Sequence, residues 1–239
     1  GIDFWWLDWQ QWGTTKITGV TPTWWLNYVF FTDMERRGKN RPLLFHRWGG
    51  LGNHRYQIGF SGDAFSVWES LAFQPYFTAT AANVGFGYWS HDIGGHMPGV
   101  VSPELYTRWI QFGVFSPMLR THTTKNPDAE RRIWAYPEAY FTVMRDAFRL
   151  RYALIPYLYT QARRTYDTGV SLCHPLYYDY PESEESYAYT GQYAFGDDMI
   201  VAPVVSPVDT VDHLARQNIW IPPGEWIEWH TGAQLVGPR

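Results

Sequence analysis

Short apolar runs alternate with amphipathic stretches over the first two-thirds of the chain, and this alternation restricts the fold more than any other feature. The run at residues 2–8 is almost continuously apolar, which is typical of a strand buried on both faces of a parallel sheet. Stretches with helical spacing separate such runs, as in repeated βα units. The sequence therefore predicts an α/β fold over residues 1–168.

The expected elements follow from the same pattern. We expect strands at residues 2–8, 42–47, 56–63, 86–92 and 115–122, and helices at 22–38, 65–83, 103–112 and 137–166. Thr21 precedes Pro22 as an expected cap, and Gly38 is suited to the left-handed end of that helix. Pro75 predicts a break and Pro156 a kink.

The pattern changes after Gly169. Four short strand-like runs, at residues 174–178, 199–205, 219–222 and 226–229, are separated by Pro, Gly and Asp. We therefore expect residues 169–239 to begin an all-β domain that is incomplete within this sequence.

Composition excludes several classes of function. Of 239 residues, 23 are acidic and 19 basic, so the net charge of −4 does not favour nucleic-acid binding. The single Cys173 excludes an intrachain disulfide, and the sequence lacks the run of about 18 apolar residues that a membrane span requires. Aromatic residues make up 19% of the chain, and their flat apolar faces suit sugar rings. Localisation and oligomeric state remain open.

Polar or ionisable residues end the expected strands. They are Asp8, Arg47, Asp63, Asp92 and His122. If the strands form part of a (β/α)₈ barrel, their carboxyl ends meet on one face, so these side chains converge. Capping of the following helices explains any one of them, but it explains the whole set poorly, because Trp6, Phe60 and Trp89 lie beside them in sequence.

Two carboxylates in an aromatic pocket provide the groups that cleave a glycosidic bond. One must be ionised, and the other must hold a proton for the leaving oxygen, which burial and a neighbouring negative charge favour. The residues alone do not decide which carboxylate has which role.

Several segments also occur in a characteristic order. They are GIDFWWLD at 1–8, Arg47, RY at 55–56, SGD at 61–63, YWSHDIGG at 88–95, PMLRTH at 117–122, RYALIPYLY at 151–159 and FGDDMIVAPV at 195–204. Together they resemble glycoside hydrolase family 31, and they cover nearly the whole chain.

The resemblance implies a fold and a set of roles. The fold would be the C-terminal portion of a (β/α)₈ TIM barrel, with about five βα units, followed by the start of a β-sandwich domain. Asp8 would be the nucleophile and Asp63 the acid/base, while Trp6, Arg47, Phe60, Trp89, Asp92 and His122 would bind the substrate. The implied activity is hydrolysis of terminal α-linked, α-glucoside-like sugars in a glycoside or oligosaccharide, with retention and without a cofactor. Since five strands leave a barrel open, we expect the chain alone to be poorly soluble or inactive.

Other functions remain open at this point. Trp9, Gln10 and Gln11 stand where this family commonly has Met-Asn-Glu, and Phe60 stands where Trp is frequent. The sugar could therefore differ, as in an α-xylosidase, α-galactosidase or α-N-acetylgalactosaminidase. An α-glucan lyase and a non-catalytic carbohydrate-binding protein are further alternatives. A metal-dependent hydrolase using His91, Asp92 and His96 is disfavoured, because their spacing matches no known ligand pattern.

Overall fold

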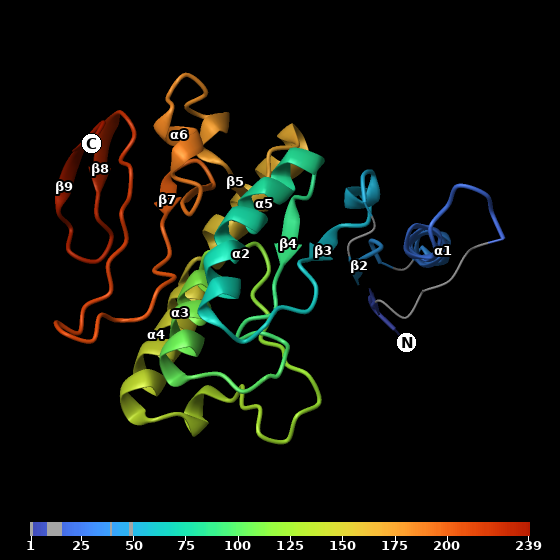
Figure 1. Cartoon of the computed structure of the whole chain (residues 1–239). Coiled ribbons are helices and arrows are strands. Elements are labelled where there is room, and N and C mark those ends of the chain that lie inside the picture. The colour runs from blue at the N-terminus through green and yellow to red at the C-terminus, as the bar shows by residue number, and fades with distance from the viewer. Residues whose placement is uncertain (1, 9–15, 39, 48–49) are drawn as a thin grey trace.

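A parallel sheet of four strands forms the first part of the chain (Figure 1). The computed structural model describes residues 2–8, 16–38, 40–47 and 50–239. The strands are β1 (Trp5–Leu7), β2 (Leu44–Arg47), β3 (Ile58–Phe60) and β4 (Tyr88–Ser90), in that spatial order. Trp6 lies opposite Phe45, and Arg47 lies opposite Phe60. The predicted α/β fold is confirmed.

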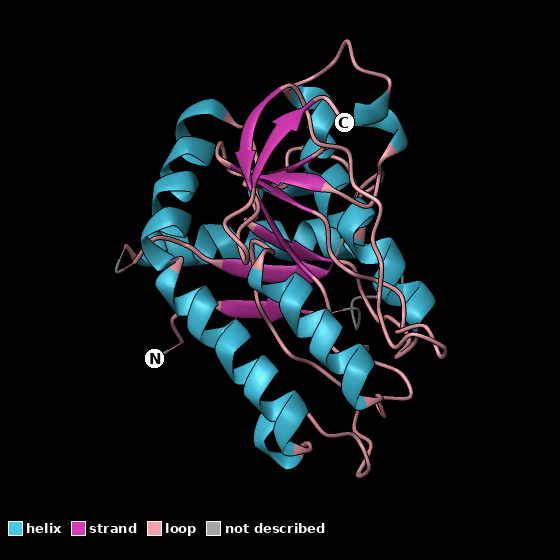
Figure 2. Cartoon of the chain, turned by 90° about the vertical axis from the view of Figure 1, so that its left-hand side faces the viewer, coloured by secondary structure: helices cyan, strands magenta, loops and turns pink. Residues whose placement is uncertain are grey.

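Among the described residues, β2 is followed by a 3₁₀ helix, Asn53–Arg55, whereas α-helices follow β1, β3 and β4 (Figure 2). The α-helices of this part of the chain are α1 (Pro22–Arg37), α2 (Trp68–Thr80), α3 (Pro103–Val114), α4 (Glu138–Ala153) and α5 (Ile155–Thr168). The predicted ends of α1 are confirmed, because the Thr21 side chain accepts the Trp24 N–H and Gly38 has φ 63°.

The two proline predictions have different outcomes. Helices α4 and α5 meet at Leu154, two residues before Pro156, so the kink is confirmed. The break at Pro75 is wrong, since α2 runs through it. Pro75 lies on the buried side of α2 with Leu71 and Ala79, and this packing offsets the lost helical hydrogen bond.

The sheet separates two apolar layers because successive side chains alternate between its faces. On the helix side, Leu7 and Leu44 pack against residues of α1, and Trp89 packs with Phe77 of α2. On the opposite, inner face, Phe45, Ile58 and Phe60 form a separate cluster with Tyr88 and Met118. Inner-face side chains that lie just beyond the carboxyl ends of the strands are therefore brought close together.

The prediction of a strand at 115–122 is wrong. This segment pairs with the sheet edge only through a parallel bridge between Ile93 and Thr121. Arg151 donates hydrogen bonds to the carbonyls of Val114, Ser116 and Pro117 at 2.6–2.9 Å, so this side chain holds the start of the segment in place of strand pairing. Pro117 also lacks the N–H that a strand would donate.

The remainder of the chain contains short antiparallel elements. The first sheet joins β5 (Cys173–His174), β6 (Tyr193–Phe195) and β7 (Met199–Val201), and the second joins β8 (Gly224–Ile227) and β9 (Gln234–Gly237). The short helix α6 spans Glu185–Ala188, and 3₁₀ helices lie at Asn53–Arg55, Ala81–Val84, Ile133–Ala135 and Leu176–Tyr178.

Two expectations for this region need correction. The run at 174–178 is mostly a 3₁₀ turn, and 219–222 forms no strand, although Ile221 and Arg239 exchange both backbone hydrogen bonds. Strands β6 and β9 were not predicted. Helix α5 ends at Gly169 with φ 77°, but packing continues across this point, because Trp109 and Phe112 of α3 share one core with Tyr193 and Phe195. The division at residue 169 stays a prediction.

Among the described residues, no helix is both long enough and apolar enough to cross a membrane.

Candidate active site

Arg47, the last residue of β2, joins the two carboxylates that sequence analysis singled out. Its Nη1 lies 2.9 Å from Oδ1 of Asp8 and 3.0 Å from Oδ1 of Asp63. Because one nitrogen contacts both oxygens, these oxygens lie at most about 6 Å apart, a limit that is compatible with the separation of about 5–5.5 Å typical of retaining glycosidases. Asp8, Arg47 and Asp63 are thus brought together from three adjacent strands.

Sheet alternation explains this convergence. Asp8 lies two residues after Trp6, and Arg47 two residues after Phe45, so all four belong to the inner face. Asp63 lies beyond the end of β3, in the connection to α2. In a parallel sheet the carboxyl ends of the strands share one edge, and this edge gathers the three groups.

Arg120 adds a second guanidinium to the site, within a group of aromatic rings. Its Cζ lies 5.3 Å from the ring centre of Trp6, 4.9 Å from that of Phe45 and 5.2 Å from that of Phe60. The same guanidinium bonds Oδ1 of Asp92. Burial lowers the pKa of Arg120, and Asp92 opposes this effect.

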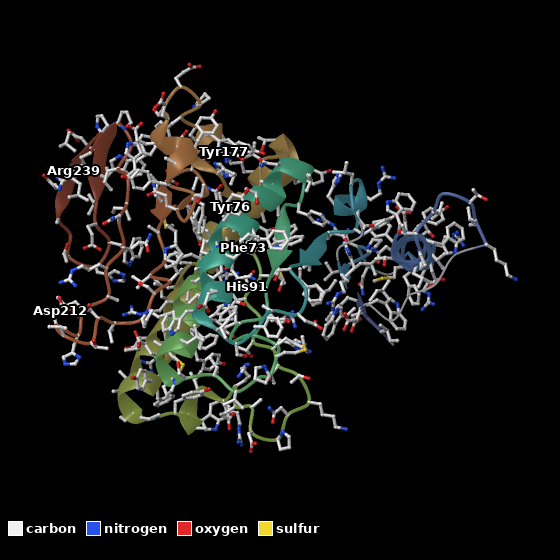
Figure 3. The ribbon with its side chains drawn as sticks, viewed as in Figure 1. Phe73, Tyr76, His91, Tyr177, Asp212 and Arg239 are labelled. Carbon is white, nitrogen blue, oxygen red and sulfur yellow. The ribbon has the colours of Figure 1, made fainter. Side chains whose placement is uncertain are left out.

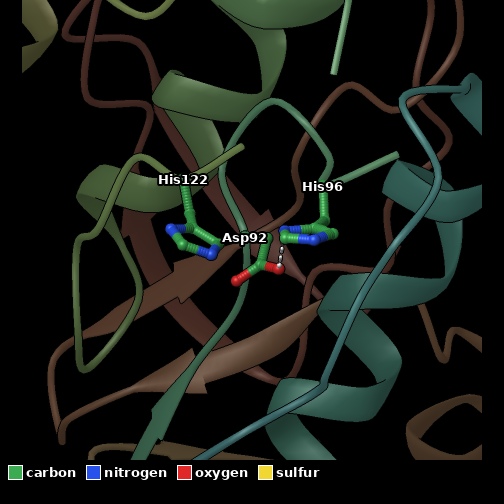
Figure 4. A group of neighbouring side chains, drawn as sticks. All are labelled: Asp92, His96 and His122. Carbon is green, nitrogen blue, oxygen red and sulfur yellow. Dashed lines mark ion pairs between the residues drawn. The ribbon is translucent and has the colours of Figure 1, made fainter. Parts of the chain in front are cut away.

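Asp92, His96 and His122 form a polar cluster beside Arg120 (Figure 4). The rings of His96 and His122 are stacked, with centres 5.1 Å apart, and Trp6 meets His122 edge to face at 5.3 Å. Nδ1 of His96 lies 3.8 Å from Oδ2 of Asp92, and Nε2 lies 3.9 Å from Oδ2 of Asp63. His96 therefore lies between Asp92 and the candidate catalytic carboxylate Asp63.

The electrostatics of these groups follow from burial and from their neighbours. Burial lowers the pKa of Arg47, but the Asp8 and Asp63 carboxylates outweigh it, so the net pKa is raised. Burial raises the pKa of Asp92, with Arg120 opposing. Burial, assisted by Arg120, lowers the pKa of His122 to about 4, so this imidazole is neutral near pH 7. A neutral imidazole beside carboxylates can both donate to and accept from sugar hydroxyls.

Arg131 holds the loops that carry these side chains. Its guanidinium donates to the carbonyls of Gly94, Gly95, Gly99, His122 and Glu130 at 2.6–3.1 Å. It thereby links the loop after β4, which carries His96, to the segment that carries His122. Gly95 fits against the backbone of Ser66, where a Cβ would lie 2.5 Å from the Ser66 Cα.

Two residues discussed at the sequence level lie outside this arrangement. Trp89 is on the helix side of the sheet with Phe77 and Phe86, because it alternates with Tyr88 and Ser90. His91, labelled in Figure 3, is fully buried. Its ring stacks on Phe112 of α3 at 4.5 Å and accepts the indole N–H of Trp109 at 3.1 Å. The triple His91, Asp92 and His96 therefore does not converge.

The other predicted binding residues surround the carboxylates. Phe60 lies beneath Arg47, with its ring centre 5.4 Å from the guanidinium carbon, and Trp6 is partly exposed beside His122. The unusual positions Trp9, Gln10 and Gln11 lie outside the described residues.

A metal ion is the alternative occupant of the Asp92, His96 and His122 cluster. One donor atom from each lies within 4.8 Å of the others. Arg120, however, already bonds Asp92, and its positive charge would repel a divalent cation at this position. The donor set therefore suits hydroxyl groups better than a cation.

Sequence reasoning assigned no role to Arg120 or Arg131, and it considered His96 only as a metal ligand. Arg120 lies two residues before His122, so period-two alternation could have placed both on one face. Arg131 lies in an irregular loop, and no local pattern indicates its contacts.

Comparison with known proteins identifies the family. Residues 1–161 match the family model described as "Glycosyl hydrolases family 31 TIM-barrel domain", and residues 169–239 match "Glycosyl hydrolase family 31 C-terminal domain". Alpha-glucosidase 2 of Bacillus thermoamyloliquefaciens is 32% identical over 82% of this chain and 24% of its own length. An alpha-xylosidase of Saccharolobus solfataricus is 30% identical over 87% of this chain and 28% of its own length. The chain thus spans less than a third of these curated relatives.

Solved structures agree with this assignment. A cycloalternan-degrading enzyme from Trueperella pyogenes, in complex with a covalent intermediate, superposes with a TM-score of 0.82 at 28% identity, covering 91% of this chain and 30% of that one. A dextranase from Flavobacterium johnsoniae, complexed with glucose, gives a TM-score of 0.80 at 29% identity, covering 90% and 27%. The parallel sheet with its following helices corresponds to part of a TIM barrel, and the chain belongs to glycoside hydrolase family 31.

Proposed function

We propose that this chain carries the catalytic pair of a retaining α-glycosidase that hydrolyses terminal α-linked, glucoside-like sugars. The observation that carries the proposal is the bridging position of Arg47, whose single Nη1 contacts the carboxylates of Asp8 and Asp63. Relatives named alpha-glucosidase and alpha-xylosidase match at similar identity, which supports the class of reaction and leaves the sugar to be determined.

The proposed reaction has two displacements. In the first, a carboxylate oxygen of Asp8 attacks the anomeric carbon, the glycosidic C–O bond breaks, and Asp63 gives its proton to the departing oxygen. In the second, Asp63 takes a proton from water, the water oxygen attacks the anomeric carbon, and the bond to Asp8 breaks. Two inversions return the original α-configuration.

Other residues would hold the sugar while these bonds change. Arg47 stabilises negative charge on both carboxylates, and Asp92 and His122 lie where they can bind hydroxyl groups. Trp6 offers a partly exposed ring on which a sugar face can stack.

Azide rescue tests the two roles separately. The variants Asp8→Ala and Asp63→Ala are made in the complete natural protein and assayed on a panel of aryl α-glycosides with sodium azide. We expect Asp63→Ala to give the α-glycosyl azide, because azide replaces water in the second displacement. We expect Asp8→Ala to give the β-glycosyl azide, because azide then replaces the missing nucleophile. The same anomer from both variants, or loss of activity in only one of them, would contradict the assignment.

A further inference from the structure

His96 lies between two carboxylates whose remaining oxygens are already engaged by arginines. Asp63 uses Oδ1 to accept from Arg47, so Oδ2 faces His96 at 3.9 Å. Asp92 uses Oδ1 to accept from Arg120, so Oδ2 faces the other ring nitrogen at 3.8 Å. Among the described residues, neither Oδ2 of Asp92 nor Nδ1 of His96 has a hydrogen-bond partner.

The backbone holds this imidazole against the loop of Asp63. The N–H groups of His96 and Met97 donate to the carbonyl of Ala64, the residue after Asp63, at 2.6 and 3.1 Å. The N–H of Ser66 donates to the Met97 carbonyl at 2.8 Å. The loop after β4 and the loop after β3 are therefore joined, and these bonds fix the backbone of His96 beside that of Asp63.

The arginine contacts decide which oxygen of Asp63 can carry the catalytic proton. A guanidinium only donates hydrogen bonds, so Oδ1, which accepts from Arg47, stays unprotonated. The proton of the acid form belongs on Oδ2, the oxygen that faces His96. Asp92 faces Nδ1 of His96, so Nε2 of the same ring is the nitrogen that faces Oδ2 of Asp63.

We propose that His96 is a positioning residue that fixes the place of Oδ2 of Asp63, the oxygen that carries the catalytic proton, with Asp92 orienting the imidazole. This inference rests on the proposed function, since it needs Asp63 to act as the acid. The two gaps, 3.8 and 3.9 Å, are longer than hydrogen bonds, and we expect them to shorten by about 1 Å when a sugar fills the site, as catalytic contacts commonly do. Arg120 and the stacked His122 are the other charged or titratable groups beside this imidazole.

Leaving-group dependence separates acid positioning from a merely structural role. A 2,4-dinitrophenyl leaving group departs without a proton, whereas a phenyl leaving group requires one. We measure kcat/KM, which reports the first displacement, for both α-glycosides of the preferred sugar in the complete natural protein. We expect His96→Phe to lower the value for the phenyl glycoside at least about tenfold more than for the dinitrophenyl glycoside, within the range of general acid catalysis.

Two amide variants identify which ring nitrogen matters. The amide of Gln reaches the position of Nε2, and that of Asn reaches the position of Nδ1. We expect His96→Gln to recover most of the phenyl-glycoside activity and His96→Asn to resemble His96→Phe. His54→Phe, a change at an exposed histidine on the helix side near Phe86, is the matched control, and both its rates should equal those of the unmodified protein.

The outcomes distinguish this inference from the proposed function. Equal losses on both substrates in His96→Phe, or no loss on either, overturn the positioning role of His96. If Asp63→Ala itself lacks the leaving-group dependence, the proposed function fails instead. Circular dichroism of each variant establishes that it is folded, and the two amide variants decide the question if the Phe variant is not.

Discussion

His91 links the stability of the core to pH through a hydrogen bond that only its neutral form can make. Nδ1 accepts from the indole N–H of Trp109, which can only donate, so Nδ1 must carry a lone pair. The proton therefore sits on Nε2, which lies 2.8 Å from Oγ of Ser116. Burial, with Arg120 adding to it, lowers the pKa of His91 from 6.5 to about 3.

The depressed pKa sets the size and the direction of the effect. Below pH 6.5 the His91 imidazole of the unfolded chain binds a proton, whereas in the folded protein it does so only near pH 3. The free energy of unfolding therefore falls as the pH falls through this window. Between about pH 7.5 and about pH 5 these two values correspond to a loss of about 2 kcal/mol from this one imidazole.

The variant His91→Asn isolates this contribution. Its amide oxygen can accept from Trp109 but does not titrate, so the part of the pH dependence due to His91 should disappear. Urea unfolding, followed by tryptophan fluorescence at the two pH values, gives the change in unfolding free energy for both proteins, and the difference between them cancels the other titrating groups. We expect the variant to lose about 2 kcal/mol less than the unmodified protein on acidification. Equal losses in the two proteins would refute the reasoning.

Two further predictions follow from the faces of the sheet and from the polar cluster. Trp6→Leu should raise KM several-fold with little change in stability. Trp89→Leu, on the helix side, should lower the unfolding free energy by about 1–3 kcal/mol and leave KM unchanged. A larger effect on KM from Trp89→Leu than from Trp6→Leu would contradict the assignment of faces. Incubation with EDTA should leave kcat/KM unchanged, because Arg120 already engages Asp92; loss of activity that zinc restores would favour a metal at the cluster.

The positions of residues at the carboxyl ends of the strands made much of the site predictable from sequence. Asp8, Arg47 and Asp92 end or follow strands, and a parallel sheet gathers such positions regardless of side-chain detail. The prediction for Trp89 did not use the alternation within its own strand, which places that ring with Phe77.

Features that depend on contacts distant in sequence could not be predicted in this way. The sequence before Thr121 predicts a strand. In the structure Arg151, more than 30 residues away, donates hydrogen bonds to main-chain carbonyls at the start of that segment. His96 similarly acquires its position from a backbone contact to Ala64, for which the chain has no local pattern.

The contacts of Arg131 have a consequence for how the substrate range of such a protein can change. This guanidinium donates to main-chain oxygens of the loops around the site. It excludes a side chain at Gly94, where a Cβ would lie 2.7 Å from its Nε, but its hydrogen bonds set no requirement on the side chains at the other, non-glycine positions of these loops. Amino-acid replacements there can alter which sugar is accepted while the scaffold keeps its shape. Selection for a new substrate can therefore act on single positions without first requiring other substitutions that restore the fold of the loops.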